Sequence, residues 1–350
     1  MMMNLGGPAS LPEVEPFLTR LLSDKEIVKL PIQHISGPLI ARRRAVKVRK
    51  QYDMIGGGSP IRKWTQAQGE GLCAILDKEH PSTAPHKPYI AFRYADPMTP
   101  EALKRISEDG ISRVVAFSQY PQYSCSTTGS SLNELYRTIT NHPEYTKFHF
   151  SVIDRWFSNA HLLKTFAGLI RESLEKLFEV EEREKVVLLF SAHSLPLSVV
   201  ARGDAYPHEV AATVKGVMEE LGYSNPHFVV WQSKVGPTPW LKPSTADAIV
   251  GLSEKGHKKQ LLVPIAFTSD HIETLYEYDI LYKELALKKD IKLRRVPALN
   301  DNPQFINTLA HIVMEHLDQE PFKASSVQLK MQCPQCVNPD CLKMKTHFAP

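Results

Sequence analysis

The chain reads Leu261-Leu262-Val263-Pro264-Ile265-Ala266-Phe267 and, after Thr268, continues Ser269-Asp270-His271-Ile272-Glu273-Thr274-Leu275-Tyr276-Glu277-Tyr278-Asp279. The first run is apolar and of strand length, and the second carries one histidine and four carboxylates. Open α/β sheets bind ligands outside the carboxyl ends of their strands, so this order predicts chemistry at a strand end. If the second run is helical, Glu273 and Glu277 share one face and repel each other by roughly 0.2–0.5 kcal/mol. Bound protons, a metal cation or solvent would offset that repulsion.

Apolar runs of strand length recur along the chain and alternate with helical patterns. The expected strands are residues 89–94, 114–117, 186–190, 228–232 and 261–267. The expected helices are residues 101–108, 161–178, 208–221, 244–255 and 304–317. This alternation predicts an α/β fold of two similar Rossmann-like domains, each a parallel sheet flanked by helices. We expect these domains at residues 1–159 and 160–325, with a C-terminal extension at residues 326–350.

Some stretches interrupt this alternation, and we interpret them as exposed loops that bear apolar groups: residues 17–40, 56–60 and 235–241. Close to the first of them, six basic residues crowd together: Arg42, Arg43, Arg44, Lys47, Arg49 and Lys50. Such a cluster is typical of a solvated helix face, of contact with an anionic surface, or of binding to an anionic substrate. An apolar patch beside it would suit an amphipathic ligand or a membrane surface.

Composition argues against several classes of protein. With 42 Lys and Arg against 38 Asp and Glu in 350 residues, the net charge of +4 is too mild to indicate a nucleic-acid partner. No apolar run reaches the roughly 18 residues that span a bilayer, so we expect a soluble or peripheral protein. The chain lacks G-x-x-x-x-G-K-S/T, and neither Ser130 nor Ser191 lies in a G-x-S-x-G motif, which argues against a nucleotide enzyme and an esterase.

Three cysteines near the C-terminus have the spacing of metal ligands. Cys333 and Cys336 are separated by two residues, and Cys341 follows after four more. A zinc site would take His347 as its fourth ligand, whereas an iron–sulfur cluster would need a distant cysteine, for which Cys125 at a strand end is suited. Spacing alone leaves zinc slightly ahead, with free structural thiols as a third alternative.

His193 directly follows the apolar run 186–190 and Ser191, so we expect it at the rim of a sheet. A neutral imidazole with a pKa near about 6.5 can accept a proton at physiological pH. His271 and Glu273 follow the matching strand in the same domain, and a chain of carboxylates can pass a proton on or guide a cation. The pairing predicts proton removal near a metal.

Several motifs, in the same order along the chain, resemble those of the ferrochelatase family. They are Gly56-Gly57-Gly58-Ser59-Pro60, residues 119–131 from Gln119 to Ser131, Ser191-Ala192-His193-Ser194-Leu195-Pro196 and Ser269-Asp270-His271-Ile272-Glu273-Thr274-Leu275. The resemblance extends over almost the whole chain. It implies a chelatase-like fold and a lyase that inserts Fe²⁺ into protoporphyrin IX with release of two protons, the terminal step of haem biosynthesis. A tetrapyrrole-binding carrier or an inactive paralogue would keep the same pocket without turnover.

The resemblance also implies roles for individual residues. His193 would take a pyrrole proton, Glu273 would be its partner carboxylate, and Glu277 would extend a polar track towards Asp279. The residues that would hold the porphyrin propionates are Arg44, Tyr52 and Ser59. Those that would line the pocket are Leu5, Leu21, Ile27, Arg93, Tyr120, Trp240 and Phe267. Histidine and carboxylates bind Fe²⁺ less tightly than thiolates do, which suits a metal that must be handed on.

The terminal cysteines resemble those of the animal branch of the family, whose members hold a [2Fe–2S] cluster. This resemblance replaces the zinc interpretation and implies the ligands Cys125, Cys333, Cys336 and Cys341. Animal members work as homodimers on the matrix side of the mitochondrial inner membrane, so the resemblance implies a homodimer with peripheral membrane contact, here without a presequence. Leu281 and Ala160-His161 depart from the family pattern, and we leave the outer end of the carboxylate track and a surface metal site out of the expected site.

Overall fold

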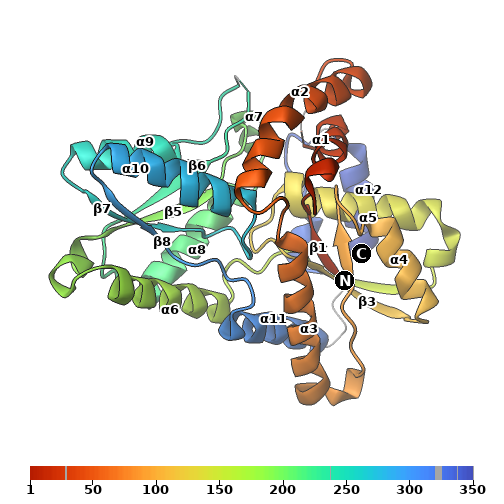
Figure 1. Ribbon diagram of the computed structural model, residues 1–350. Coiled ribbons are helices and arrows are strands. Elements are labelled where there is room, and N and C mark those ends of the chain that lie inside the picture. Colours follow the sequence, from red (N-terminus) through yellow and green to blue (C-terminus); the bar gives the residue numbers. More distant parts are fainter. Residues whose placement is uncertain (28–29, 237, 320–324, 337, 350) are drawn as a thin grey trace. The chain divides into compact units, whose positions relative to one another are not determined.

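Two four-stranded parallel sheets, each flanked by helices, make up the computed structural model (Figure 1). The structure describes residues 1–27, 30–236, 238–319, 325–336 and 338–349. Val28, Lys29, Pro237, Val337 and Pro350, which fall in three of the stretches singled out above, therefore lie outside the described residues. The chain divides into two units, the first made of Met1–Trp156 and Leu309–Pro350 and the second of Phe157–Thr308. The predicted α/β fold with two parallel sheets is confirmed.

The elements have the following bounds. The strands are β1 (Met2–Asn4), β2 (Ile90–Phe92), β3 (Arg113–Ser118), β4 (His149–Ile153), β5 (Val187–His193), β6 (His227–Gln232), β7 (Lys259–Val263) and β8 (Lys292–Arg295). The α-helices are α1 (Val14–Ser23), α2 (Gln33–Met54), α3 (Ile61–Glu79), α4 (Thr99–Glu108), α5 (Ser130–Asn141), α6 (Ala160–Leu177), α7 (Leu197–Ala201), α8 (Tyr206–Glu220), α9 (Thr245–Glu254), α10 (Lys283–Lys288), α11 (Pro303–Leu317) and α12 (Pro339–Phe348). Two π-helices are η3 (Cys125–Gly129) and η6 (Glu273–Tyr282). Short 3-10 turns are η1 (Leu11–Glu13), η2 (Pro81–Thr83), η4 (Pro143–Tyr145), η5 (Val180–Lys185) and η7 (Val327–Lys330).

Both sheets have the same strand order. It is β2-β1-β3-β4 in the first unit and β6-β5-β7-β8 in the second, and every pairing is parallel. The winding direction therefore reverses between β1 and β3 and again between β5 and β7. Doubly wound sheets bind ligands at this switch point, outside the carboxyl ends of the strands. The residues that follow these four strands are thus the candidates for a functional site.

The second sheet is buried on both faces, which explains the nearly unbroken apolar sequence of its strands. Leu188, Leu189 and Phe190 of β5 are 0% exposed. The helices α9, η6 and α10 cover one face, where Ile249 and Tyr282 belong to the same buried cluster as Leu189. The helices α6 and α8 cover the other face (Figure 1). This packing fixes the positions at which β5 and β7 end.

In the first unit, α12 completes the core. Its Cys341 and Met344 belong to the same buried cluster as Leu132 of α5. A guanidinium nitrogen of Arg137, also on α5, lies 3.8 Å from a carboxylate oxygen of Asp340. The C-terminal extension is therefore packed into this unit.

The unit boundaries differ from those expected at residues 159 and 325. Nε2 of His80 lies 2.9 Å from Oδ1 of Asp318, just after α11. The hydroxyl of Ser326 donates a hydrogen bond of 2.8 Å to Asp154. These contacts place the chain from Leu309 onward in the first unit. These contacts join residues far apart in the sequence. The periodic pattern of apolar residues predicts helices and strands but not such contacts.

The expectation of an exposed loop over residues 17–40 was wrong. Of the described residues in this range, 17–23 belong to α1 and 33–40 to α2, and Phe17 and Leu18 are buried. Exposed apolar groups are nevertheless present, because Ile35 and Leu39 of α2 are 60% and 55% exposed. Helix α2 thus has an apolar surface that no described residue covers.

Two strand ends also differ from the prediction. The run expected to continue to Phe267 leaves the sheet after Val263, because Pro264 has no N–H to donate and Phe267 N–H turns back to the Pro264 carbonyl at 3.2 Å. In contrast, β5 continues beyond Phe190 and ends at His193. The polar end of that strand is still paired within the sheet.

Candidate active site

His193 is the last residue of β5, at the carboxyl edge of the second sheet. Its Nδ1 lies 3.1 and 3.0 Å from the two carboxylate oxygens of Glu273. A carboxylate can only accept hydrogen bonds, so Nδ1 carries the proton in this pair and Nε2 is the nitrogen with a free lone pair. The side chain of His193 is 38% exposed, so a substrate can approach it.

Glu273 is the first residue of the π-helix η6, in the segment that follows β7. The side-chain amide of Gln232 donates to its Oε2 at 3.1 Å, and Nε2 of His271 lies 3.9 Å from the same oxygen. Burial alone would raise the pKa of Glu273, but the charge and hydrogen bond of His193, with His271 and Gln232, lower it to about 2. Glu273 is therefore a carboxylate at neutral pH and joins the switch-point strands β5 and β7 through a side-chain contact.

Glu277 lies four residues further along the same π-helix. The hydroxyl of Ser233 donates to its two oxygens at 2.7 and 2.9 Å, and the hydroxyl of Tyr282 donates to Oε2 at 3.4 Å. Burial and repulsion by Glu273 raise the pKa of Glu277 to about 7, against the opposing effect of the Ser233 hydrogen bond. Protonation of Glu277 can therefore offset the repulsion between the two glutamates. The segment from Glu273 to Tyr282 is helical, in the form of a π-helix, a rare form that is frequent at functional sites.

Burial disfavours the charged form of His193, but the charge and hydrogen bond of Glu273 and the charge of Glu277 outweigh it and raise the His193 pKa. A base with a raised pKa accepts a proton more readily than free imidazole does. The site therefore combines a strong neutral base, a carboxylate that stabilises its protonated form, and a second group that exchanges protons near neutral pH.

Trp240 provides an aromatic wall beside this group. Its ring centroid lies 6.5 Å from that of His193 in an edge-on arrangement. The Trp240 backbone bridges to Pro196, and its indole N–H donates to the Thr238 hydroxyl at 3.1 Å. The backbone bridge and the indole hydrogen bond position the ring, which offers a surface for a flat apolar ligand.

The carboxylate track does not continue freely to Asp279. Two guanidinium nitrogens of Arg295 donate to the two oxygens of Asp279 at 2.8 and 2.7 Å. A third nitrogen lies 3.3 Å from Asp270. Leu281 is 46% exposed and contributes no polar group. Asp279 and Asp270 are therefore both paired with one arginine, so neither is a free extension of the track from Glu277.

In the first unit, the β1/β3 switch point carries Leu5 and Tyr120. The N–H of Leu5 donates to the Tyr120 hydroxyl at 2.8 Å. The loop with Ser59 lies against the same segment, since Ser59 N–H donates to the Pro8 carbonyl at 2.7 Å. A Cβ added at Gly7 would come within 2.7 Å of the Ser59 side chain, so only glycine allows this close approach. Three of the expected substrate residues are thus gathered at one edge of this sheet.

Arg44 and Tyr52 lie on α2, where Tyr52 is 3% exposed and Arg44 is partly exposed. The Arg44 guanidinium has no ion-pair partner within the described part of the chain. Arg93, which follows β2, is different, because its side chain is 14% exposed and pairs with Asp24 and, at 3.4 Å, with Glu134. Arg44 is therefore the cation that remains available to an anionic ligand, whereas Arg93 is already neutralised.

Sequence reasoning missed Gln232 and Ser233. Gln232 ends β6 and is 2% exposed, and Ser233 adopts the left-handed region with φ 62°. Together they bind Glu273 and Glu277, so they set the positions of both carboxylates. Polar residues directly after the apolar run 228–231 were the available signal. Backbone strain in a non-glycine residue is frequent at functional sites.

The cysteines expected to bind metal all belong to the first unit. The N–H of Cys336 donates to the Cys333 carbonyl at 2.9 Å. Burial raises the pKa of Cys341 to about 11, Lys345 opposes this, and the nearby Cys336 and Cys333 raise it further. The three C-terminal thiols are thus close enough to interact. Across the described ranges, however, no group of three or more His, Cys, Asp or Glu side chains is arranged to hold a metal ion.

Cys125 begins η3, which leads directly into α5, and α12 packs against α5. Both expected parts of the ligand set therefore lie on neighbouring elements of one unit. His347, the alternative fourth ligand, packs its ring against Tyr136 and Phe348 with centroids 5.3 and 4.8 Å apart.

A parallel α/β fold with a histidine–carboxylate pair at a switch point is the arrangement that an enzyme needs to move protons. One solved structure with this fold is SirB from Bacillus subtilis with Fe³⁺, with a TM-score of 0.50 and 12% sequence identity over 71% of this chain and 88% of that one. A family model described as Ferrochelatase matches residues 1–317. The chain belongs to the ferrochelatase family, lyases that insert Fe²⁺ into protoporphyrin IX.

Curated relatives support the same assignment over the full length of the chain. The protein described as "Ferrochelatase, mitochondrial" from Bos taurus is 53% identical over 99% of this chain and 83% of its own length. The protein of the same description from Homo sapiens is 52% identical over 99% of this chain and 82% of its length. That from Schizosaccharomyces pombe is 46% identical over 99% and 82%.

Proposed function

We propose that His193 accepts a pyrrole proton when this chain inserts Fe²⁺ into protoporphyrin IX, and that Glu273 stabilises the imidazolium so formed. The observation that carries this proposal is the contact of 3.0 Å between His193 Nδ1 and Glu273, which leaves Nε2 as the accepting atom. An imidazolium next to a carboxylate is electrostatically favourable, so the transfer costs less than it would at an isolated histidine.

Insertion replaces two N–H protons of the macrocycle by one Fe²⁺, so a second proton has to leave. Glu277, with a pKa of about 7, can take up this proton as a carboxylate and release it to solvent at neutral pH. Iron is a substrate here, and a histidine with two carboxylates binds it weakly enough to hand it on. We therefore assign the catalytic roles to His193, Glu273 and Glu277.

The substrate-binding roles rest on the residues at the first switch point and on Trp240. We propose that Arg44 pairs with a propionate and that Tyr52 and Ser59 donate hydrogen bonds beside it. The remaining wall residues are Leu5, Arg93, Tyr120 and Trp240. In this assignment Arg93 forms part of the pocket wall and does not pair with a propionate, because its guanidinium already pairs with Asp24 and Glu134.

The resident cofactor we propose is a [2Fe–2S] cluster held by Cys125, Cys333, Cys336 and Cys341. The donor set fits in its chemistry, because thiolates are the soft ligands that such clusters require and the three C-terminal thiols lie near one another. Such a cluster supplies one-electron redox chemistry when it is bound, and the proton transfers assigned above do not use it.

Replacement of one proposed ligand, Cys336→Ser, is expected to remove the visible absorbance of the cluster. A serine hydroxyl is a poor substitute for a thiolate, so the cluster should be lost or strongly depleted. Absorbance between roughly 300 and 600 nm and iron content per chain provide the measurement. Cys73→Ser is the matched control, because Cys73 is in α3 and outside the proposed ligand set. Retention of full absorbance in Cys336→Ser would show that the ligand set is wrong.

We further propose a mitochondrial location, on the matrix side of the inner membrane, with peripheral membrane contact and a homodimeric state. The relatives named above are described as mitochondrial. Helix α2 exposes Ile35 and Leu39 beside the cations Arg42 and Arg43, a combination that suits an anionic lipid surface. No helix in the described ranges is both long and apolar enough to cross a membrane. The homodimer rests on the family resemblance.

Anaerobic incubation with Fe²⁺ and protoporphyrin IX tests the proposed function. Loss of porphyrin fluorescence together with the appearance of haem absorbance is the expected result. Tight porphyrin binding without haem would favour the alternative of a tetrapyrrole-binding carrier or an inactive paralogue. Absence of porphyrin binding would contradict both.

The raised pKa of Glu277 makes stability depend on pH. A carboxyl group whose pKa rises from 4.5 to about 7 on folding stabilises the folded chain while protonated, and this stability is lost as pH rises between these values. We expect Glu277→Gln to raise the free energy of unfolding at pH 8 by on the order of 2 kcal/mol, with little change near pH 5. Urea denaturation at both pH values measures the difference. The exposed Glu284→Gln should show no such pH dependence, and an equal effect of Glu277→Gln at both pH values would contradict the assignment.

A further inference from the structure

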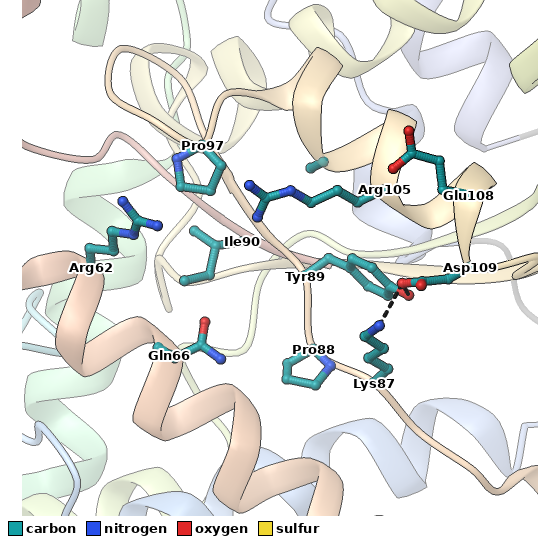
Figure 2. Close-up of a pocket in the computed structure, with 11 residues that line it drawn as sticks. Arg62, Gln66, Lys87, Pro88, Tyr89, Ile90, Pro97, Arg105, Glu108 and Asp109 are labelled. Atoms are coloured by element: carbon teal, nitrogen blue, oxygen red, sulfur yellow. Dashed lines mark hydrogen bonds and ion pairs between the residues drawn. The ribbon is translucent and has the colours of Figure 1, made fainter.

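A second concave site lies in the first unit, away from the carboxyl edge of its sheet. It has a volume of about 340 Å³ and lies between α3, the segment that leads into β2, and α4 (Figure 2). Lys87 and Tyr89, on its floor, precede β2, whereas Arg93 follows this strand. Because a volume of this size is at the lower end for small-molecule sites, the pocket can hold a small metabolite.

Two arginines with no other role line the pocket. Arg62 comes from the first turn of α3, and Arg105 comes from the last turn of α4. Neither guanidinium forms a hydrogen bond or ion pair with any residue that the structure describes. Figure 2 shows Arg62 and Arg105 on opposite sides of Ile90 and Pro97, with both side chains extending towards the space between them. Both residues are exposed, so two cations without a protein partner lie at one cavity, an arrangement that suits an anionic ligand.

The acidic residues of the pocket, Asp109 and Glu108, lie near lysines and form no ion pair with either arginine. Asp109 lies 2.6 Å from the Lys87 ammonium and also accepts a hydrogen bond from the Tyr89 hydroxyl. Glu108 lies 3.8 Å from Lys104, one turn earlier on α4. With Arg62, Lys87 and Arg105 against Glu108 and Asp109, the lining of the pocket is net positive.

The wall is mixed, with Gln66 and the charged residues beside an apolar part. Pro88, Ile90 and Pro97 line the pocket, and Ile90 is 7% exposed. A bare inorganic ion would leave this surface without a partner, whereas an organic group attached to the anion would cover it. The pocket thus combines an anion-binding end with an apolar floor, the arrangement that binding sites for small organic acids require.

We propose that this pocket binds a small organic anion, whose phosphate or carboxylate group pairs with Arg62 and Arg105 while its apolar body lies against Ile90, Pro88 and Pro97. This site is separate from the proposed porphyrin site, since its lining residues differ from those at the carboxyl ends of β1 and β3. It adds a second ligand of the chain besides the porphyrin and iron.

Phenyl phosphate, benzoate and inorganic phosphate are suitable probes, because the first two share an apolar body and the last has none. We expect calorimetric titration of the full chain to show binding of phenyl phosphate or benzoate at least about tenfold tighter than inorganic phosphate. The tighter of the two organic probes then identifies the anionic group. Binding of inorganic phosphate as tight as that of both organic probes, or no binding of any probe up to about 10 mM, would overturn the proposal.

Variants test where the probe binds. We expect Arg62→Gln and Arg105→Gln each to weaken binding at least about tenfold, with partial recovery in Arg105→Lys. Lys78→Gln removes a charge from the far end of α3, and Arg44→Gln removes the cation assigned to the propionates. Both controls should bind the probe as the native chain does. Native affinity in Arg62→Gln and Arg105→Gln, or loss of affinity in Arg44→Gln alone, would refute this site. Because binding is measured directly, the result does not depend on iron insertion.

Discussion

His193→Ala is expected to lower kcat for iron insertion by about 10²–10⁴-fold while porphyrin binding stays within a few-fold of native. The substitution removes the Nε2 atom that we assign as the proton acceptor. It leaves Trp240 and the residues of the first unit unchanged, so the surface available to the macrocycle remains. The measurement is steady-state haem formation under anaerobic conditions, together with porphyrin affinity from fluorescence quenching.

An exposed histidine of the same unit, His257, provides the control, and His257→Ala should retain native turnover. The variant His193→Ala also leaves Glu273 without its partner, so its folding has to be checked by circular dichroism. Turnover of a folded His193→Ala protein within about threefold of native would exclude His193 as the acceptor.

Glu273→Gln is expected to reduce kcat by on the order of 10²-fold or more and to lower the pKa of His193. The amide keeps the size of the side chain but has no charge to stabilise an imidazolium. Because the carboxylate is what raises the His193 pKa, its removal leaves burial as the dominant effect, which acts in the opposite direction. The acidic limb of the kcat profile should therefore move to lower pH.

Titration of the His193 ring resonances by NMR measures this shift directly, with His193→Ala used to assign them. The exposed Glu284→Gln on α10 is the control and should change neither kcat nor the titration. If the pKa of His193 were unchanged in Glu273→Gln, Glu273 would not be the group that stabilises the imidazolium. That result would contradict the assignment even if kcat fell.

The position of the site could be predicted from sequence because it depends on burial. β5 is apolar through Phe190 and then turns polar, which places His193 at the edge of the sheet. The segment after β7 follows the same rule, so Glu273 could be assigned to the neighbouring strand end. These predictions needed only the rule that ligands gather at the carboxyl ends of parallel strands.

The details of the site could not be predicted, since they depend on contacts between distant residues. Gln232 and Ser233 reach Glu273 and Glu277 from another strand, 41 and 44 residues earlier in the chain. The π-helical form of η6 and the φ of Ser233 are local departures for which the sequence carries no rule. Arg295 likewise pairs with Asp279 from another segment of the chain. The spacing of apolar residues predicts each segment but not the contact between them.

The discontinuity of the first unit has a consequence for synthesis. Phe157–Thr308 is one unbroken segment, so it can fold as soon as residue 308 has left the ribosome. Met1–Trp156 is made earlier, but the face of α5 that carries Leu132 has to wait for Cys341 and Met344 on α12. Residues translated first therefore reach their final packing last, and a ribosome that stops near residue 330 would release a finished second unit attached to an unfinished first one.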